Sequence, residues 1–455
     1  MVASCSKDII PTPNYVQNIP EVKNNPVLVK TGFLIDTDWF NRNYAGYKNQ
    51  TNRWYGYGDF NKDGLKDIVC VFASNGTQDY LWQNDTTKRL VVGVFLNNRT
   101  YFELDTNLVY SYLGGWNGAN VSDIDNDGYL DIYQMTGYWE GSTKSKPAYY
   151  NNSGHGGMDS YVFMNDKNKS FKRYTIPVKD NAGSTTSIIS DNNKNGYKEI
   201  YSSACMCYYE FDGNNLNEIP LVLNKTFEGR SYDLRVITPK YQSEKYGVYY
   251  LASDNFTGTY FILKVINNTL TPIVKYETPI YKSGFTEGTN SERDEMYIED
   301  LDNDGIPEYI IPCQTFSTET TWCTPYLLFL DSKGNDITSK FLDKSITNPL
   351  NYNQFNAGIK NVTGFIYHTF ADIDNDGIKE IFSASGLGYY MNGDTYYFKL
   401  INGKYTPVFY HSGWYGDVNT TDKNTGYWPF VDEKNKVNVF TATERTTNHF
   451  IIKTF

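Results

Sequence analysis

The stretch DIDNDGYLD, residues 123 to 131, carries four aspartates and a glycine within nine positions. Gly128 at position 6 supplies a sharp turn that a residue with a Cβ resists. Alternating carboxylates with one backbone carbonyl, here that of Tyr129 at position 7, suit the oxygen cage that calcium prefers. An EF-hand would need a bidentate Glu at position 12 between two helices, but position 12 is Gln134 in a β-rich run. The spacing predicts a calcium loop outside an EF-hand, with side-chain ligands Asp123, Asp125, Asp127 and Asp131.

The same pattern recurs along the chain, and each copy precedes an apolar or alternating stretch typical of a β-strand. The further copies are DFNKDGLKD from 59, DNNKNGYKE from 191, DLDNDGIPE from 300 and DIDNDGIKE from 372. In the long gap after 191, the strand-like YGVYYLASD, 246 to 254, predicts a degenerate copy beginning near Pro239, and a shortened copy begins near Asp432. The seven copies have a mean period of about 62 residues.

A repeat of this length predicts one closed domain of radially arranged units. Each unit fits four strands, which in the first are expected at 52 to 58, 67 to 73, 90 to 97 and 100 to 105. No window shows a sustained helical period. The expected fold is an all-β, seven-bladed β-propeller that spans 25 to 455, with calcium loops between the first and second strands.

The chain ends predict how the ring closes. Only three good strands follow the last loop, whereas NPVLVKTGFLI, 25 to 35, precedes the first unit and has no place in it. We expect this segment to supply the outer strand of the last blade. Residues 1 to 24 are expected to form a tether.

The five loops, the strands that follow them and their spacing resemble the FG-GAP or VCBS repeats of integrin-α-like seven-bladed propellers, over nearly the whole chain. The resemblance implies calcium on the face where first and second strands join. It implies side-chain ligands at positions 1, 3, 5 and 9 and the carbonyl at position 7. Beyond the second loop, these are Asp59, Asn61, Asp63, Leu65 and Asp67; Asp191, Asn193, Asn195, Tyr197 and Glu199; Asp300, Asp302, Asp304, Ile306 and Glu308; and Asp372, Asp374, Asp376, Ile378 and Glu380.

Four of these loops are rich in carboxylates, whereas the third has only two and is expected to bind calcium more weakly. The fourth and seventh units are expected to bind none. The alternative is that these are Asp/Asn/Gly turns without metal, because such residues dominate loops in general. The charge favours metal: five calcium ions would bring the formal charge of −11 to about −1.

The composition excludes a nucleic-acid partner, because the chain has no basic cluster and its pI is about 5.0. Calcium loops fit an extracellular or cell-surface location, where the ion is abundant. VASCSKD, 2 to 8, resembles the cleavage box of bacterial lipoproteins, although no hydrophobic region stands before it. Either a lipid on Cys5 anchors the chain as an outer-membrane lipoprotein, or Cys5 is an ordinary thiol in a disordered tail.

The remaining cysteines allow one favourable bridge. Cys313 and Cys323 bracket a long loop between two strands and are expected to pair in an oxidising compartment. Cys205 and Cys207 alternate along one strand or its end, so a direct bridge would be strained. Cys70 is expected to be a buried strand residue.

The longest predicted loops join second to third strands and each unit to the next, which places them on the face opposite the calcium loops. They are rich in aromatic residues, Asn, Gly and Thr, a composition that fits recognition of a ligand by loops on a rigid scaffold. Tyr and Trp rings stack on sugar rings, although many of the aromatic residues must serve packing. The candidate ligand-binding residues are Trp139, Tyr149, Tyr150, His155, Trp322, His411 and Trp414.

Two functional classes remain open. The first is a non-catalytic extracellular binding protein that recognises a glycan or a protein partner, which is also what the resemblance implies. The second is a polysaccharide lyase, which needs a base such as Tyr or His and a cation that neutralises the uronate. No spacing ties the histidines and tyrosines of this chain into such a site, so the binding protein is favoured. A subunit of a surface assembly is a third reading.

Overall fold

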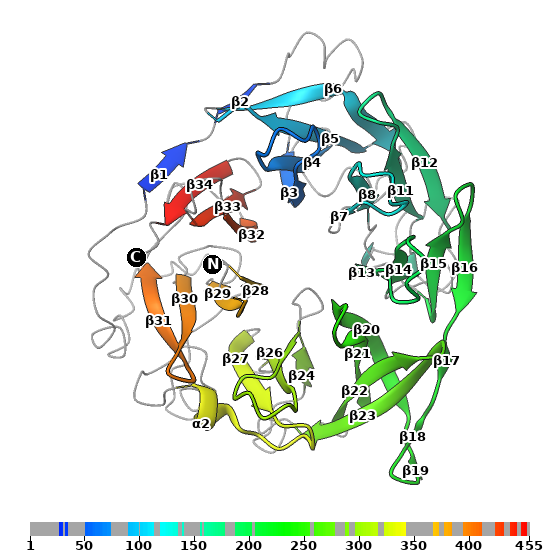
Figure 1. Cartoon of the computed structure of the whole chain (residues 1–455), viewed down its shortest axis with the longest axis vertical. Coiled ribbons are helices and arrows are strands. Elements are labelled where there is room, and N and C mark those ends of the chain that lie inside the picture. The colour runs from blue at the N-terminus through cyan, green and yellow to red at the C-terminus, as the bar shows by residue number, and fades with distance from the viewer. Residues whose placement is uncertain are drawn as a thin grey trace, which may run out of the picture.

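The computed structural model places the chain in an all-β architecture (Figure 1). It describes residues 27–30, 32–34, 51–73, 90–99, 101–112, 119–134, 139–140, 155–156, 159–177, 187–202, 205–254, 259–277, 287–290, 296–316, 323–342, 367–372, 377–384, 395–411, 424–431, 437–443 and 447–452. Within these ranges the single helix is the short α2 (Thr338–Phe341). No helix in the described part is long and apolar enough to cross a bilayer.

Among the described residues, seven sheets of four or five strands follow one another around a ring (Figure 1). The first sheet has the order β2-β6-β5-β4-β3, from β2 (Gly32–Leu34), β3 (Thr51–Gly58), β4 (Asp67–Ala73), β5 (Leu90–Asn97) and β6 (Tyr101–Tyr112). The second has the order β12-β11-β8-β7, from β7 (Ala119–Ser122), β8 (Asp131–Gln134), β11 (Ser160–Asn165) and β12 (Phe171–Ile176). The third runs β13-β14-β15-β16, from β13 (Ser187–Ser190), β14 (Glu199–Ser202), β15 (Cys207–Phe211) and β16 (Leu216–Pro220).

The remaining sheets complete the ring. The fourth has the order β17-β23-β22-β21-β20, from β17 (Val222–Leu223), β20 (Leu234–Ser243), β21 (Gly247–Asp254), β22 (Thr259–Ile266) and β23 (Thr269–Glu277). In the fifth, β26 (Glu308–Phe316) pairs with β24 (Glu287–Asn290), β25 (Tyr297–Glu299) and β27 (Cys323–Leu330). The sixth is β28 (Tyr367–Ala371), β29 (Glu380–Ala384), β30 (Thr395–Ile401) and β31 (Lys404–His411). The last is β1 (Val27–Lys30), β34 (Thr447–Ile452), β33 (Val437–Thr443) and β32 (Asn424–Val431).

Two short ribbons stand apart from these sheets. They are β9 (Trp139–Glu140) with β10 (His155–Gly156), and β18 (Thr226–Phe227) with β19 (Arg230–Ser231). The strands of the first sheet confirm the ranges that alternation predicts, except that β6 runs on to Tyr112.

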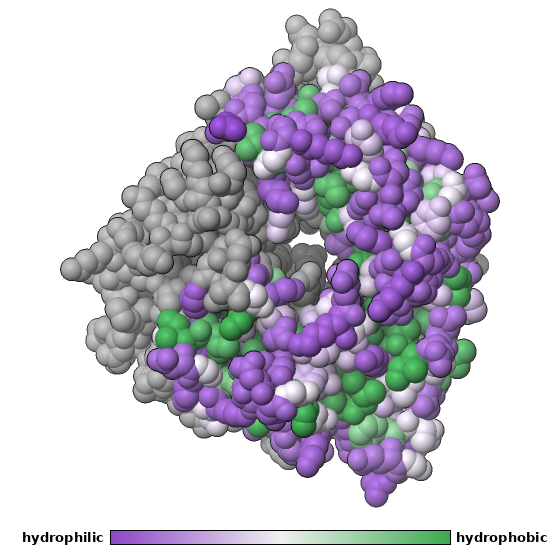
Figure 2. All heavy atoms as spheres, in the orientation of Figure 1, coloured by the Kyte–Doolittle hydropathy of each residue, from purple (hydrophilic) through white to green (hydrophobic). Residues whose placement is uncertain are grey.

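The hydrophobic core lies between neighbouring sheets. One cluster joins the first and second sheets through Phe60 and Phe163, which are both fully buried. Another joins the second and third sheets, a third joins the third and fourth, and the largest spans the fourth, fifth and sixth. Burial of each large apolar side chain contributes about 1.5–3 kcal/mol, so contact between sheets stabilises the ring. Figure 2 shows a largely hydrophilic face with an opening at its centre.

The N-terminal segment joins both ends of the ring. β1 pairs antiparallel with β34, with Val27 opposite Ile451. β2 instead pairs parallel with β6 of the first sheet, with Gly32 opposite Tyr101. The segment expected as one strand of the last sheet is therefore divided between the last sheet and the first. It connects the two sheets covalently.

In the fifth sheet, β24 and β25 pair with successive parts of β26 and so share one position, which leaves β27 as the outermost of its described strands. The expected unit has one further strand outside β27. After β27 the chain pairs back through a bridge between Leu330 and Asp336. The Thr338 hydroxyl then accepts the backbone N–H of Phe329, a donor that a fourth strand would have used. Helix α2 follows, and Phe341 packs against Phe329 with ring centroids 5.9 Å apart. A helical turn thus replaces the outer strand in this sheet.

The fourth unit contains no nine-residue loop. The strand predicted at 246 to 254 is confirmed as β21, but β20 continues through Pro239 to Ser243. Only residues 244 to 246 connect the two strands, so the degenerate loop expected near Pro239 was wrong. The loop predicted at Asp432 lies outside the described residues.

The cysteine expectations were wrong for two pairs. Cys205 and Cys207 form a disulfide with Cα atoms 5.2 Å apart, because β15 begins only at Cys207 and Cys205 belongs to the preceding bend. The register of β26 and β27 sets Cys313 opposite Tyr326 and Cys323 opposite Phe316. That offset of three residues is about 10 Å, beyond the usual span of a bridge. Cys70 is buried as expected.

Candidate calcium sites

The five acidic loops occupy one kind of position in the fold. Each joins two strands that are consecutive in the chain and paired in one sheet, and position 9 is the first residue of the later strand. The pairs of strands are β3 and β4, β7 and β8, β13 and β14, β25 and β26, and β28 and β29. In the sixth sheet, Asp372, Ile378 and Glu380 are described, whereas the predicted ligands Asp374 and Asp376 lie outside the described residues.

The described loops share one backbone conformation. Position 6 is a glycine with a positive φ in all five, from +86° at Gly128 to +94° at Gly196. Position 4 also has a positive φ in the four loops described there, at Lys62, Asn126, Lys194 and Asn303. Two left-handed residues in one short loop bend the chain around a centre, and only glycine adopts that conformation without steric cost.

The position-1 carboxylate anchors this bend. In every loop the N–H of the position-6 glycine donates to one of its oxygens, for example from Gly128 to Asp123 Oδ2 at 2.9 Å and from Gly196 to Asp191 Oδ2 at 3.1 Å. The same bond is present in the other three loops. The position-5 side chain in turn accepts the N–H of position 7 in four loops. Each loop is thereby closed by its own side chains.

The second oxygen of the position-1 carboxylate is the feature that points to a cation. In Asp123, Asp191 and Asp372, Oδ1 is buried and has no hydrogen-bond partner. A buried anionic oxygen without a partner costs free energy, and a bound cation would remove that cost. In the first and fifth loops the corresponding oxygen accepts the N–H of position 5, at 3.0 Å in Asp59 and Asp300.

Positions 3 and 5 complete a triad of carboxylates in two loops. One oxygen from each of Asp123, Asp125 and Asp127 lies within 4.8 Å of the others, and the same holds in the fifth loop for its three aspartates, Asp300, Asp302 and Asp304. Like charges this close repel one another unless a cation lies among them. Hard carboxylate oxygens suit calcium or magnesium. Calcium is favoured because it accepts a variable number of oxygen ligands in flexible geometry, whereas magnesium requires a regular octahedron. The donor set therefore fits the predicted ion.

The position-9 carboxylates join the loop to the sheet. Asp131 Oδ2 accepts the N–H of Ile124 at 2.8 Å, and its Oδ1 accepts the N–H of Asn165 on the third strand at 2.7 Å. Asp67 makes the equivalent bonds, and Glu199 and Glu308 accept from position 2 of their own loops. Position 9 is outside the two carboxylate triads. It serves as a structural anchor in addition to the ligand role that the sequence predicts.

Burial controls the protonation of these anchors. It raises the pKa of Asp67 to about 7, that of Asp131 to about 8 and that of Glu199 to about 7, although backbone N–H groups partly oppose the shift. Burial also raises the pKa of Glu308. A nearby calcium ion would favour the ionised form of each group.

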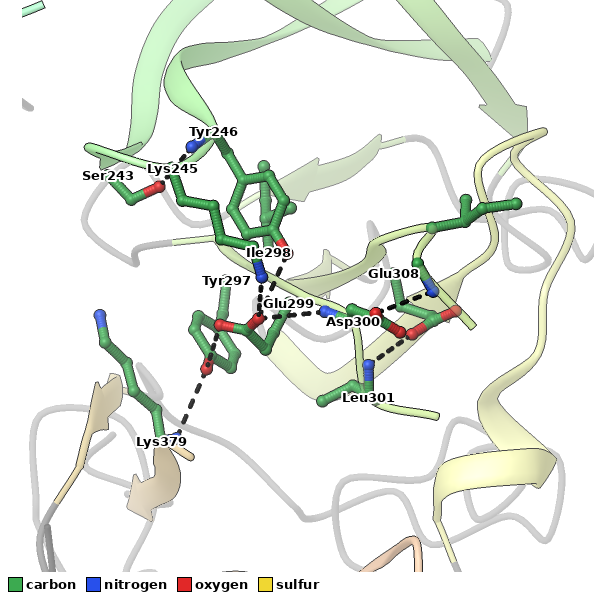
Figure 3. Close-up of polar contacts among 12 residues, drawn as sticks. Ser243, Lys245, Tyr246, Tyr297, Ile298, Glu299, Asp300, Leu301, Glu308 and Lys379 are labelled. Carbon is green, nitrogen blue, oxygen red and sulfur yellow. Dashed lines mark hydrogen bonds and ion pairs between the residues drawn. The ribbon is translucent and has the colours of Figure 1, made fainter. Parts of the chain in front are cut away.

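The fifth loop has protein cations beside it, as Figure 3 shows for Glu299, the residue before its first aspartate. Glu299 accepts from Lys245 Nζ at 3.0 Å and from the Tyr246 hydroxyl at 3.2 Å, both in the tight turn of the fourth sheet. The ammonium of Lys340, a residue of α2, forms an ion pair with Asp302 at position 3. This contact lowers the pKa of Asp302, and a calcium ion would share that carboxylate with it.

Adjacent loops touch one another. The backbone N–H of Lys198 in the third loop donates to the carbonyl of Ile124 in the second at 2.9 Å. Lys62 in the first loop places its ammonium 3.7 Å from the ring centroid of Tyr129 in the second. The first three loops therefore lie side by side on one face of the ring.

Sequence reasoning missed Glu210, Lys245 and Lys340, which reach these loops from a strand, a turn and helix α2. Each of these residues is far in sequence from the loop that it contacts, so no local pattern indicates the contact. Of the predicted ligand-binding residues, Trp139 and His155 lie on the paired strands β9 and β10, with His155 opposite Glu140. His411 ends β31 opposite Thr395. Four more lie outside the described residues: Tyr149, Tyr150, Trp322 and Trp414.

No protein-family model matches the sequence, and no curated protein matches it either. Solved structures give partial similarities. They include the dihydro-heme d1 dehydrogenase NirN (TM-score 0.41, 9% identity, 88% of this chain and 66% of that chain) and the V. cholerae biofilm matrix protein Bap1 (TM-score 0.38, 11% identity, 94% and 70%). BBS1N in complex with ARL6DN is similar over 75% of this chain and 93% of its own, with 9% identity and a TM-score of 0.33. Similarities at this level identify no family.

Proposed function

We propose that this chain is a calcium-stabilised, extracellular or cell-surface binding protein built as a seven-bladed β-propeller of the FG-GAP or VCBS type. The observation that carries the proposal is the position-1 aspartate. One oxygen holds the glycine N–H in all five loops, and in three loops the other is buried without a partner. Four loops are the stronger calcium sites, and the third, with Asn193 and Asn195, is the weaker fifth.

Seven blades account for the arrangement of the sheets. Seven sheets of four or five strands occupy the described residues, and their cores lie between neighbours. The pairing of β1 with β34 supplies the outer strand of the last blade from the N-terminus. Such a ring leaves few open edges, which suits a protein that must persist outside a cell.

The recognition surface is the face opposite the calcium loops. Strands alternate in direction within each sheet, so the connections from second to third strands emerge at the other end from the acidic loops. The β9–β10 ribbon lies in one of these connections and sets Trp139 opposite Gly156. Aromatic and polar loop residues suit a glycan or an extracellular protein as partner. Attachment to a membrane would need only a lipid on Cys5.

A glycan array probed with the calcium-loaded protein and with metal-depleted protein tests this function. Selective binding to one sugar class, weakened about tenfold or more on substitution of Trp139 by Ala, is the expected result, because a ring stacked on a sugar would contribute on the order of 1.5–3 kcal/mol through its buried apolar area. Substitution of Trp54 in β3 is the matched control. No binding to sugars, together with release of unsaturated products from uronate polymers, would replace the binding proposal with a lyase.

The stabilisation by calcium should grow with pH. The folded-state pKa values of Asp67 and Asp131, about 7 and about 8, exceed the unfolded value near 3.9. Without metal, the stability due to these groups is present below about pH 4 and is lost as the pH rises through 7 to 8. With calcium the ionised carboxylates are compensated, so that loss is reduced.

The measurement is the difference in Tm between calcium-loaded and resin-depleted protein, recorded at pH 5.5 and pH 8. We expect the difference to widen by several degrees at pH 8. Resin depletion avoids a chelator whose own affinity depends on pH. A difference that stays constant or shrinks would contradict the coupling between calcium and these carboxyl groups.

A further inference from the structure

Glu210 lies beside the third acidic loop but belongs to the third strand of its sheet. The register of β14 and β15 sets it opposite Glu199, the position-9 residue. Its Oε1 accepts a hydrogen bond from Asn193 Nδ2 at 2.7 Å and another from Asn195 Nδ2. One carboxylate oxygen thus holds both amides of the loop.

An asparagine ligand has two different ends. Its Oδ1 can bind a cation, whereas its Nδ2 carries two donors and repels one. In this loop Oδ1 of Asn193 accepts the N–H of Asn195 at 3.0 Å, and Oδ1 of Asn195 accepts the N–H of Tyr197 at 2.9 Å. The amide oxygens therefore face the loop, and the nitrogens face Glu210. Each oxygen retains a second lone pair for a metal ion.

A separate observation points to a cation in this loop. Asp191 Oδ1 is buried and has no hydrogen-bond partner, while its Oδ2 is held by Gly196. That oxygen lies at position 1 of the same loop and lacks the compensation that a calcium ion would give.

We propose that Glu210 is the positioning residue of the third calcium site: it fixes the orientation of the Asn193 and Asn195 amides so that both oxygens are available to the ion. This inference rests on the proposed calcium function and deepens it. A carboxylate outside the ligand shell that orients first-shell groups commonly contributes 10–100-fold to metal affinity.

The other loops show why this sheet needs such a residue. Ile68, Ile132 and Ile200, which follow position 9, pair with Phe95, Phe163 and Tyr209. The next third-strand residues are Leu96, Met164 and Glu210. The second loop has aspartates at positions 3 and 5, and either carboxylate oxygen can bind metal. In the first loop, Asn61 donates its amide to Asp63 at 3.0 Å, so that loop orients its own asparagine.

The test measures calcium per chain by equilibrium dialysis over a range of free calcium, on the full chain. Asp191→Asn first identifies which class of sites belongs to the third loop. Glu210→Ala should weaken that class 10–100-fold and leave the others unchanged. Glu210→Gln keeps an oxygen acceptor, so the calcium affinity of the third-loop sites should fall less than in Glu210→Ala. Glu218→Ala, an exposed charge on β16 of the same sheet, is the matched control and should change nothing.

A second background separates positioning from direct ligation. In Asn193→Asp/Asn195→Asp, neither ligand needs orientation, and Glu210 faces two carboxylates in place of two donors. Glu210→Ala should there leave the affinity unchanged or raise it. Weakening in both backgrounds would show that Glu210 binds the ion itself and would overturn the proposal. If Glu210→Ala leaves the calcium affinity of the third-loop sites unchanged, the positioning role of Glu210 is overturned while the calcium function stands. If the wild-type chain binds no calcium, both proposals are overturned.

Discussion

Depletion of calcium is expected to lower the midpoint of thermal unfolding by about 10 °C. Each site filled at one hundred times its dissociation constant stabilises the folded chain by about 2.7 kcal/mol, so four sites give about 10 kcal/mol. The unfolding entropy of a chain of this size is about 1 kcal/mol per degree, which converts that energy to about 10 °C. Differential scanning calorimetry of resin-depleted protein, with calcium then restored, measures the shift.

The design separates specific sites from general screening of charge. Magnesium at the same concentration is the ionic control and should restore much less, because it demands a stricter octahedral site. Asp123→Asn removes one carboxylate from the second loop and should abolish about a quarter of the shift. Equal melting with and without calcium would mean that the loops are metal-free Asx turns, the alternative that composition leaves open.

The predictable part of this structure is what repeats. Each loop and its second strand are adjacent in sequence, so local rules on spacing, glycine and alternation locate them, as they do for β3 to β6. The loop conformation follows for the same reason, because Gly128 and its equivalents supply the positive φ that the bend requires. Such features need no knowledge of the rest of the chain.

The parts that sequence reasoning missed depend on partners distant in the chain or on a competing local bond. Lys340 reaches Asp302 across 38 residues, and nothing in either segment signals the other. The outer strand expected in the fifth sheet is absent from its described residues, because the Thr338 hydroxyl accepts a backbone N–H of β27 that such a strand would have used. In the fourth unit, the segment from Pro239 has no aspartates to form an acidic loop, and it pairs with β21 as far as Ser243.

Removal of the N-terminal segment should destabilise the protein nearly as much as removal of calcium. The register gives four residue pairs between β1 and β34, from Val27 with Ile451 to Lys30 with Asn448. Backbone hydrogen bonds contribute about 1 kcal/mol each, and an apolar side chain contributes about 1.5–3 kcal/mol on full burial. Deletion of residues 1 to 36 also removes β2. We expect Tm to fall by several degrees to about 10 °C.

Deletion of residues 1 to 24 is the control, because it shortens the chain and leaves both paired segments intact, so its Tm should match that of the full chain. Leu28→Pro tests the pairing without a change of length, since proline removes a donor and disrupts strand pairing opposite Phe450. Deletion of residues 1 to 36 also leaves β34 as an open edge, which favours association between chains. A peptide of residues 25 to 36 added to the deleted protein should restore part of the lost stability by occupying that edge. If deletion of residues 1 to 36 gives the same Tm as deletion of residues 1 to 24, the stability of the last sheet does not depend on β1. Contact between neighbouring sheets would then be enough to hold the ring.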